Sequence, residues 1–304
     1  MEKLVILGCG AALPASKRNP TAQILESSGR FFLIDCGEGT QSRLRENKLS
    51  FEKITDVFIS HMHGDHFLGL PGLLSTMQLL GRKKKLDIYG PPDLWEVLSL
   101  QFRVSKTTIN YELNFHPVES EAMLFEDDKI TISSIRLNHR ISCFGFIFKE
   151  KPKGRRINGP VAKEVGVPHY KMTGLREGED YTDSKGEFFP NDCLTFAPKI
   201  SFSYAFCSDN RIKTTLAERL KGITHIYHEA TFLDKEKSRA KSTYHTTVKE
   251  ACEMAQEVKP QLLILGHFSA RYEDLIDLEE EANANFENVV MAEDGKVILF
   301  ESKS

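Results

Sequence analysis

Four strong metal-binding side chains lie within six residues of this chain, in the segment His61-Met62-His63-Gly64-Asp65-His66. The segment directly follows the apolar run Val57-Phe58-Ile59, which predicts a buried strand. Loops at the carboxyl ends of strands are where α/β proteins usually place their chemistry. Imidazole and carboxylate groups at this density suit zinc, manganese or iron, and two ions can share one such loop when further ligands arrive from elsewhere. We therefore expect a fold that holds a metal centre at the end of a buried strand.

Three further residues have the position that additional ligands would need. His139, Asp209 and His267 each follow another short apolar segment, separated from it by one or a few residues. A centre with two metal ions needs such distant donors, because the first loop alone supplies too few. Asp209 is the natural bridging ligand, since one carboxylate can offer an oxygen atom to each ion.

The rest of the chain alternates between strand-like and helix-like patterns. With 304 residues, of which 40% are hydrophobic, it can bury a sizeable core. The alternation predicts mixed sheets covered by helices, a layered α/β architecture. The predicted strands are 4–7, 23–25, 31–34, 57–59, 86–89, 130–135, 144–148, 204–207, 223–227, 262–265 and 297–300, and the predicted helices are 68–80, one after Pro92, 213–220, 247–258 and 272–286. No apolar run is long enough to predict a membrane-spanning helix.

The cysteine pattern and the net charge narrow the class of protein. The six cysteines are scattered without a C-x-x-C pair, as expected of reduced thiols in a cytoplasmic protein. The formal net charge is −3, so a polyanionic partner must be held by a local basic surface.

One stretch, 151–191, interrupts the alternation. It is rich in glycine, proline and charged residues, and it lacks a sustained apolar period. Five basic residues and no acidic one lie at its start: Lys151, Lys153, Arg155, Arg156 and Lys163. We expect either a functional basic arm or a passive surface insertion. A second basic run, Arg82 to Lys85, is interpreted mainly as a cap on the preceding helix, with nucleic-acid contact as the alternative.

The sequence resembles the metallo-β-lactamase superfamily and, within it, the ribonuclease Z (transfer-RNA 3′-processing endonuclease) family. The superfamily features are the H-x-H-x-D-H loop, His139, Asp209 and His267 in this order, and the upstream segment 32–40, Phe-Leu-Ile-Asp-Cys-Gly-Glu-Gly-Thr. The family-level features are His228-Glu229-Ala230-Thr231, His245-Thr246-Thr247, Gly266-His267-Phe268-Ser269-Ala270-Arg271-Tyr272, Pro14-x-x-x-Arg18-Asn19 and the basic insertion. In the Pro14–Asn19 segment the lysine stands one place later than in the family pattern P-x-K-x-R-N. The features are spread over nearly the whole chain.

The resemblance implies an αββα sandwich: a single domain over 1–304, built of two mixed β-sheets flanked by helices, with 151–191 as an inserted flexible arm that binds transfer RNA. It implies two Zn²⁺ ions per chain, with Mn²⁺ or Fe²⁺ possible, between the sheets. One ion is assigned to His61, His63 and His139, the other to Asp65, His66 and His267, and Asp209 to both. Two divalent ions lower the pKa of a shared water and stabilise charge that develops on phosphate.

The resemblance also implies roles in catalysis and in RNA binding. Asp65 doubles as the general base, and His245 is the general acid, oriented and charged by Glu229. The expected reaction is hydrolysis of precursor transfer RNA after the discriminator nucleotide, which leaves a 3′-hydroxyl on the RNA and a 5′-phosphate on the trailer. The expected RNA contacts are Arg18, Asn19, Lys151, Lys153, Arg155, Arg156, Lys163 and Arg271.

Two other functions compete with this hypothesis. One is a small-molecule phosphodiesterase or esterase with the same metal core, and the other is an RNA-binding module without catalysis. The expected partners of the enzyme are precursor transfer RNA and a second copy of the chain in a homodimer, in which one subunit's arm grips RNA that the other cleaves. We expect a cytoplasmic location, no membrane association and no organic cofactor.

Overall fold

The computed structural model describes residues 2–14 and 18–300 and divides the chain into two compact units. The core unit comprises Met1–Lys149 and Ser203–Phe300, and the inserted unit comprises Glu150–Phe202. All six cysteines are free. No helix in the described parts of the chain is both long enough and apolar enough to cross a membrane.

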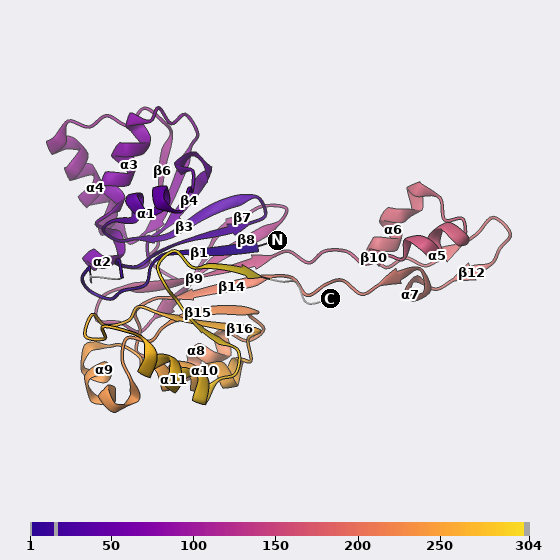
Figure 1. The fold of residues 1–304 in the computed structure, drawn as a ribbon. Coiled ribbons are helices and arrows are strands. Elements are labelled where there is room, and N and C mark those ends of the chain that lie inside the picture. The colour runs from indigo at the N-terminus through magenta and orange to yellow at the C-terminus, as the bar shows by residue number, and fades with distance from the viewer. Residues whose placement is uncertain (1, 15–17, 301–304) are drawn as a thin grey trace. The chain divides into compact units, whose positions relative to one another are not determined.

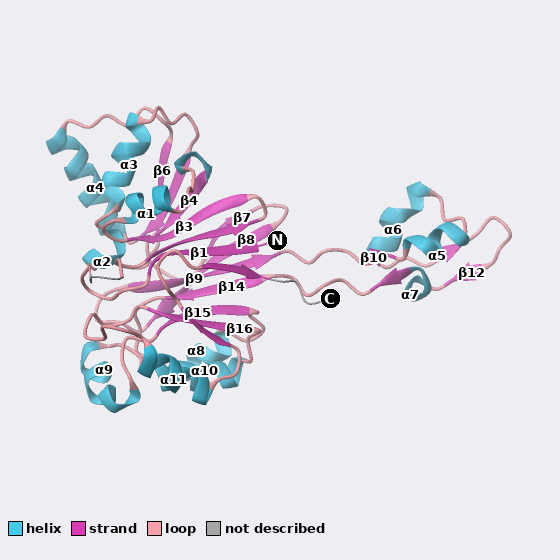
Figure 2. Cartoon of the chain, viewed as in Figure 1, coloured by secondary structure: helices cyan, strands magenta, loops and turns pink. Residues whose placement is uncertain are grey.

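A seven-stranded mixed sheet contains most of the first half of the chain (Figure 2). Strands β3 to β6 run parallel to one another, and the remaining neighbours are antiparallel. In spatial order the strands are β18 (Val297–Phe300), β1 (Glu2–Gly8), β2 (Ala22–Ser27), β3 (Arg30–Cys36), β4 (Ile54–Phe58), β5 (Leu86–Gly90) and β6 (Leu113–Pro117).

A second seven-stranded mixed sheet in the core unit is formed by strands β7 to β9 and β14 to β17. Strands β14 to β17 are parallel, whereas β9 pairs antiparallel with β14 and β7 pairs antiparallel with β8. In spatial order the strands are β17 (Val289–Met291), β16 (Leu262–Gly266), β15 (His225–Glu229), β14 (Ser203–Cys207), β9 (Cys143–Glu150), β8 (Ile130–Leu137) and β7 (Met123–Glu126).

Helices cover the outer faces of the two sheets (Figure 1). Beside the first sheet lie α1 (Thr40–Glu46), α3 (Leu70–Leu79) and α4 (Pro92–Ser105), and beside the second lie α8 (Thr214–Arg219), α10 (Val248–Val258) and α11 (Ile276–Asn285). The shorter helices of the core unit are η1 (Phe51–Lys53), α2 (Gly64–Phe67), η3 (Asp234–Glu236) and α9 (Lys237–Thr243). The capping box of Thr247 and Glu250 starts α10 where the S/T-x-x-E pattern predicts a helix to begin.

Buried aromatic rings join the two sheets. Phe32 of β3 and Phe58 of β4 come from the first sheet, and Phe146 and Phe148 of β9 come from the second. The ring centroids of Phe58 lie 5.2 Å from Phe146 and 5.4 Å from Phe148, and Phe32 lies 5.4 Å from Phe148. Alternate residues such as Leu33 pack on the other face, against the helices. Because both faces are covered, these strands appear in the sequence as continuous apolar runs.

This architecture confirms the predicted layered α/β fold of two mixed sheets flanked by helices. Two differences have local causes. The edge strands β6, β7 and β17 were not predicted; most of their side chains are exposed or only partly buried, so their sequences carry a weaker pattern. The helix predicted over 272–286 begins only at Ile276, because Tyr272 is held in a loop where its hydroxyl accepts a hydrogen bond from Leu233 N at 3.0 Å.

The inserted unit is folded, with its own small core. Its buried side chains are Ala162, Val167, Leu175, Tyr181 and Leu194. Its elements are β10 (Arg156–Ile157), α5 (Gly159–Glu164), η2 (His169–Lys171), α6 (Met172–Glu177), β11 (Tyr181–Thr182), β12 (Phe188–Phe189), α7 (Asn191–Leu194) and β13 (Thr195–Phe196). Such short elements leave no sustained apolar period, which explains why the sequence predicts a flexible segment here.

Candidate metal centre and catalytic pair

Seven predicted ligands converge at one end of the core unit, each from a loop or helix that follows a strand. His61, His63, Asp65 and His66 follow β4 of the first sheet. From the second sheet, His139 follows β8, Asp209 follows β14 and His267 follows β16. The carboxyl ends of these strands thus bring side chains from both sheets together, as the sequence predicts.

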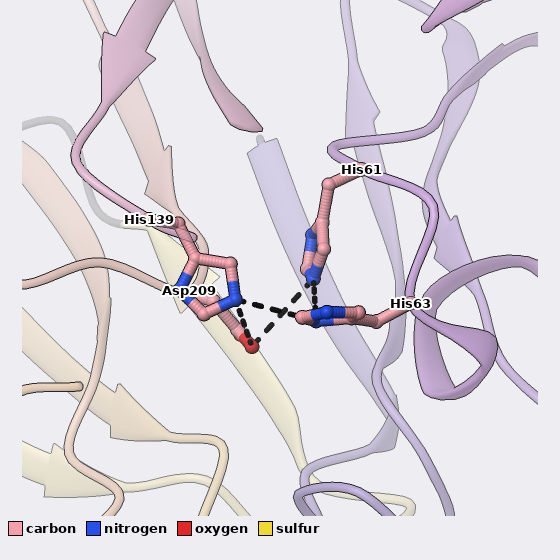
Figure 3. A group of neighbouring side chains, drawn as sticks. All are labelled: His61, His63, His139 and Asp209. Atoms are coloured by element: carbon pink, nitrogen blue, oxygen red, sulfur yellow. Dashed lines mark hydrogen bonds and ion pairs between the residues drawn. The ribbon is translucent and has the colours of Figure 1, made fainter. Parts of the chain in front are cut away.

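The first group of donor atoms consists of His61, His63, His139 and Asp209 (Figure 3). His63 Nδ1 lies 3.0 Å from His61 Nε2 and 3.2 Å from His139 Nε2. Asp209 Oδ2 completes the group at 3.6 Å from His61 Nε2 and 3.9 Å from His139 Nε2. Donors at about 2.0–2.1 Å from a tetrahedral zinc ion are roughly 3.3 Å apart, so this spacing fits one small divalent ion.

The second group consists of Asp65, His66 and His267. Asp65 Oδ2 lies 3.4 Å from the Nε2 atoms of both His66 and His267. The other carboxylate oxygen of Asp209, Oδ1, lies 3.3 Å from His66 Nε2 and 3.1 Å from His267 Nε2. Each carboxylate oxygen of Asp209 therefore faces a different one of the two groups of donor atoms. This is the geometry of a bridging carboxylate.

Two buried polar atoms in this cluster support a cation between the donors. His66 Nε2 and Asp209 Oδ1 are both buried, and although they lie 3.3 Å apart, neither makes a hydrogen bond of acceptable geometry within the described residues. Buried polar atoms of folded proteins are nearly always satisfied, so this pair supports a cation between them. Burial lowers the pKa of His61 and thereby favours the neutral imidazole that binds metal. The residues present fit a site for divalent cations.

Asp35, in β3, holds the metal-binding loop in place. Its carboxylate is fully buried and accepts hydrogen bonds from Ser60 N at 2.8 Å and Ser60 Oγ at 2.9 Å. Asp35 Oδ2 also lies 2.7 Å from His66 Nδ1, which fixes the ring and leaves its Nε2 for the cluster. The sequence places Asp35 in the motif 32–40 but does not indicate this role.

The backbone at the centre is strained and closely packed. Asp35 and His267 both have left-handed φ angles, of 54° and 58°, which non-glycine residues seldom adopt. Gly37 lets the metal-binding loop approach, because a Cβ atom there would lie 2.4 Å from the backbone oxygen of Asp65.

A histidine and a glutamate form a second pair beside the metal centre. His245 Nδ1 lies 3.0 Å from Glu229 Oε1 and 3.2 Å from Oε2. Glu229 is fully buried and also accepts a hydrogen bond from Asn210 N at 2.6 Å. Burial lowers the pKa of His245, but the Glu229 carboxylate outweighs this and raises it to about 9. Since Nδ1 is engaged by Glu229, Nε2 is the ring nitrogen that can serve a substrate.

A cavity of about 550 Å³ connects these groups, and we call it the site cavity. Asp65, Asp209, His245 and His267 contribute to its wall, together with three arginines, Arg140, Arg239 and Arg271. It therefore combines metal-binding carboxylates, an imidazole and guanidinium groups, which is a suitable surface for a phosphate ester.

The predicted RNA contacts near the metal centre differ in accessibility. Arg18 is buried, and its guanidinium donates to the backbone oxygen of Tyr272, so its observed contacts are structural. Asn19 donates from its side chain to Asp294 at 2.8 Å. Arg271 is exposed and lines the site cavity. Residues 15–17, which include the displaced lysine, lie outside the described residues.

The five basic residues of the inserted unit have different surroundings. Lys153 pairs with Glu150 at 2.6 Å, and Arg155 pairs with Asp192. Arg156 lies over the ring of Phe196, 5.6 Å from its centroid. Lys163 is exposed, and Lys151 is partly exposed.

In the basic run 82–85, the side chain of Arg82 does not cap the preceding helix, although its backbone N–H donates to Met77 O in the last turn of α3 at 3.1 Å. Arg82 is buried and donates to the backbone oxygens of Phe51 at 3.0 Å and Ile54 at 2.8 Å. It therefore joins the segment before β5 to the segment before β4.

Sequence comparisons find relatives that span nearly the whole chain. A ribonuclease Z of Bacteroides fragilis (strain YCH46) is 41% identical over 302 residues, which cover 98% of this chain and 99% of the relative. A ribonuclease Z of Porphyromonas gingivalis (strain W83) is 38% identical over 289 residues, covering 94% and 95%. A family model described as Anti-Pycsar protein Apyc1 matches residues 2–153, which exclude Asp209, Glu229, His245 and His267.

Comparisons of structure agree with the sequence relatives. Human tRNase Z, short form, has a TM-score of 0.72 and 27% identity, and the match covers 98% of each chain. The metallo-β-lactamase fold protein YhfI of Bacillus subtilis has a TM-score of 0.69 at 19% identity, covering 98% of this chain and 100% of YhfI. The core unit thus has the metallo-β-lactamase fold. From the relatives that cover nearly its full length, the chain belongs to the ribonuclease Z family.

Proposed function

We propose that the protein is a metal-dependent endonuclease that removes the 3′ trailer from precursor transfer RNA. The observation that carries this proposal is the His245–Glu229 pair beside the metal centre, in a chain whose full-length relatives are named ribonuclease Z. The cut follows the discriminator nucleotide and leaves a 3′-hydroxyl on the RNA and a 5′-phosphate on the trailer. Human tRNase Z supports the same substrate class.

The seven-residue cluster would hold two divalent ions, and its imidazole-rich donor set favours zinc. His61, His63 and His139 would hold one ion, Asp65, His66 and His267 would hold the other, and Asp209 would contribute to both sites. When bound, such ions act as Lewis acids that activate water and neutralise charge on the phosphate.

The side chains of the protein supply the proton transfers. Burial raises the pKa of Asp65, but His66 and His267 outweigh it and hold that pKa below its usual range, so the carboxylate is ionised and can accept a hydrogen bond from the attacking water. We assign it the role of general base. His245 stays protonated through neutral pH because of Glu229 and gives its Nε2 proton to the departing 3′-oxygen of the RNA. The arrangement thus assigns the base and the acid to different residues.

The direct test is incubation of the metal-loaded protein with a 3′-extended precursor transfer RNA, followed by mapping of the cut and of both new ends. A 2′-deoxy residue at the cleavage position should still permit cleavage, because water and not the 2′-hydroxyl is the nucleophile. A 2′,3′-cyclic phosphate among the products would disprove the mechanism.

We also propose that the inserted unit binds transfer RNA through Lys151, Lys153, Arg155, Arg156 and Lys163. Its ends are adjacent, since Glu150 N donates to Phe202 O at 2.8 Å, so Lys151–Ser201 can be replaced by a few glycine and serine residues. This deletion should strongly reduce cleavage of precursor transfer RNA and leave hydrolysis of a small chromogenic phosphodiester nearly unchanged. It should also flatten the salt dependence of RNA affinity.

The deletion separates this proposal from its main alternative, a small-molecule phosphodiesterase with the same metal core. Equal losses on both substrates would mean that the inserted unit supports the core unit. No loss on either would make it a passive insertion and favour the alternative.

Two parts of the proposal rest on the family resemblance: a homodimer, and a cytoplasmic location. Sedimentation of the purified protein tests the first, and cell fractionation tests the second.

A further inference from the structure

A second cavity of about 490 Å³ lies in the core unit beside the site cavity. We call it the basic cavity, because Arg136, Arg140, Lys213 and Arg219 contribute four cations to its wall, against the single carboxylate of Glu121. Most of its residues come from the end of β8, the loop after it, and the start and end of α8; Glu121 precedes β7, and Asn210 follows β14. Its volume falls within the range of roughly 300–1,000 Å³ that is typical of ligand sites.

The positive charge of the basic cavity is largely uncompensated. Glu121 forms an ion pair with Arg219. Within residues 2–14 and 18–300, no ion pair joins Arg136, Arg140 or Lys213 to a carboxylate. Three such cations facing one cavity on a chain of net charge −3 are the local basic surface that a polyanion needs.

The basic cavity and the site cavity meet at two short segments of chain. Arg140 lines both cavities. His139 and Asn210 line the basic cavity, whereas Asp209, adjacent to Asn210, lines the site cavity. A nucleotide strand that crosses the metal centre can therefore continue past His139 into the basic cavity.

The position of His245 indicates which part of the RNA would enter the basic cavity. His245 lines the site cavity and does not line the basic cavity. In the function proposed above, His245 protonates the 3′-oxygen of the RNA body, so the body lies on its side of the scissile phosphate. The strand on the other side of that phosphate is the trailer.

We propose that the basic cavity binds the phosphates of the 3′ trailer, through Arg136, Arg140 and Lys213. The inference rests on the proposed function, which names the RNA but assigns no residue to the trailer. Guanidinium and ammonium groups bind backbone phosphates without reading bases, so the cavity should accept trailers of any sequence.

The test compares Arg136→Gln/Lys213→Ala with a matched control, Arg103→Gln/Lys221→Ala, whose two exposed cations lie outside both cavities. Each phosphate contact in a single strand contributes a slope of about 0.7 to the salt dependence, which corresponds to roughly fivefold in affinity at 0.1 M salt. Removal of two phosphate-binding cations should therefore weaken binding of a 5′-phosphorylated trailer decanucleotide on the order of 25-fold. The control should bind like the wild type.

Cleavage supplies the second readout. The variant should raise KM for a precursor with a ten-nucleotide trailer and leave KM for a one-nucleotide trailer near the wild-type value. Hydrolysis of a chromogenic phosphodiester should not change. Neutral methylphosphonates in place of the trailer phosphates should weaken binding to the wild type and remove the difference between wild type and variant.

Two outcomes would overturn the inference while the proposed function stands: equal KM effects for both trailer lengths, or unchanged affinity for the decanucleotide. If the wild type fails to cut precursor transfer RNA but its affinity for the decanucleotide still depends on Arg136 and Lys213, the proposed function fails and the strand-binding site remains. The single variant Lys213→Glu keeps the test valid if the double variant is unstable, because Lys213 is exposed.

Discussion

Replacement of Asp35 by asparagine should weaken metal binding about 10- to 100-fold, or roughly 1.4–2.8 kcal/mol, while the protein stays folded. Asp35 contacts no proposed metal ion, and its effect acts through His66 and Ser60. Burial raises the pKa of Asp35, which shows that the buried carboxylate is costly in its charged form. Asparagine has the same shape and no charge, so it removes this cost. The folded state should therefore tolerate the change.

The magnitude follows from the hydrogen bonds that an amide cannot reproduce. If the asparagine oxygen takes the place of Oδ1 and accepts from Ser60 N, its NH₂ group faces His66 Nδ1. That contact favours the tautomer with the proton on Nε2, the atom needed for metal. In the opposite orientation the NH₂ group faces the Ser60 N–H, and two donors meet in a buried site. Either orientation loses an interaction that prepares the metal-binding loop.

The assay is titration of the metal-free protein with zinc, together with metal content after gel filtration. Asp56→Asn is the matched control: Asp56 is buried in β4 of the same sheet, about four residues or roughly 13 Å of strand before Ser60. The control should keep wild-type affinity. Wild-type affinity in Asp35→Asn, with an unchanged thermal midpoint, would refute the role assigned to Asp35.

Three further outcomes are expected. Asp209→Ala should lower the metal content at both positions, because one carboxylate faces both donor groups, and a variant that retained two ions per chain would contradict this assignment. His245→Ala should slow cleavage of a ribose leaving group far more than that of a nitrophenolate, which needs little protonation, and equal slowing in steady-state assays would exclude a general acid. Glu250→Gln should lower the thermal midpoint at neutral pH, because Arg211 and Thr247 outweigh burial and hold the pKa of Glu250 below 4.5. A depressed pKa stabilises the folded state above the pKa of the unfolded chain, and this stabilisation is lost as the pH falls through the folded-state pKa. The gap from the wild type should therefore close as the pH falls below 4.5, and a constant gap would contradict the pairing.

The metal centre could be predicted from the sequence because its pattern is local. Four ligands lie on one loop after an apolar run, and His139, Asp209 and His267 repeat the design of strand followed by ligand. Asp35 could not be assigned in this way, since an aspartate inside a strand gives no sign of its contact with His66 across 31 positions.

Burial decided the other differences between sequence and structure. Arg18 and Arg82 each lie next to other basic residues in the sequence. The sequence therefore suggests RNA contact for Arg18 and helix capping for Arg82. Both are buried, and both donate to backbone oxygens instead. In the inserted unit, Leu175 and Leu194 lie on short elements far apart in sequence, and only the tertiary structure brings them into one core.

Because the metal ligands come from both sheets, metal binding should stabilise the folded protein. The metal supply should therefore affect how long the protein survives in the cell. An ion held by His63 of one sheet and His139 of the other acts as a cross-link that exists only in the folded state. An ion at a hundred times its dissociation constant adds about 2.7 kcal/mol to the free energy of unfolding. Chains made where metal is scarce should therefore open more often at the site end of the sandwich and be cut there by proteases. The cellular amount of the enzyme would then follow the metal available to it.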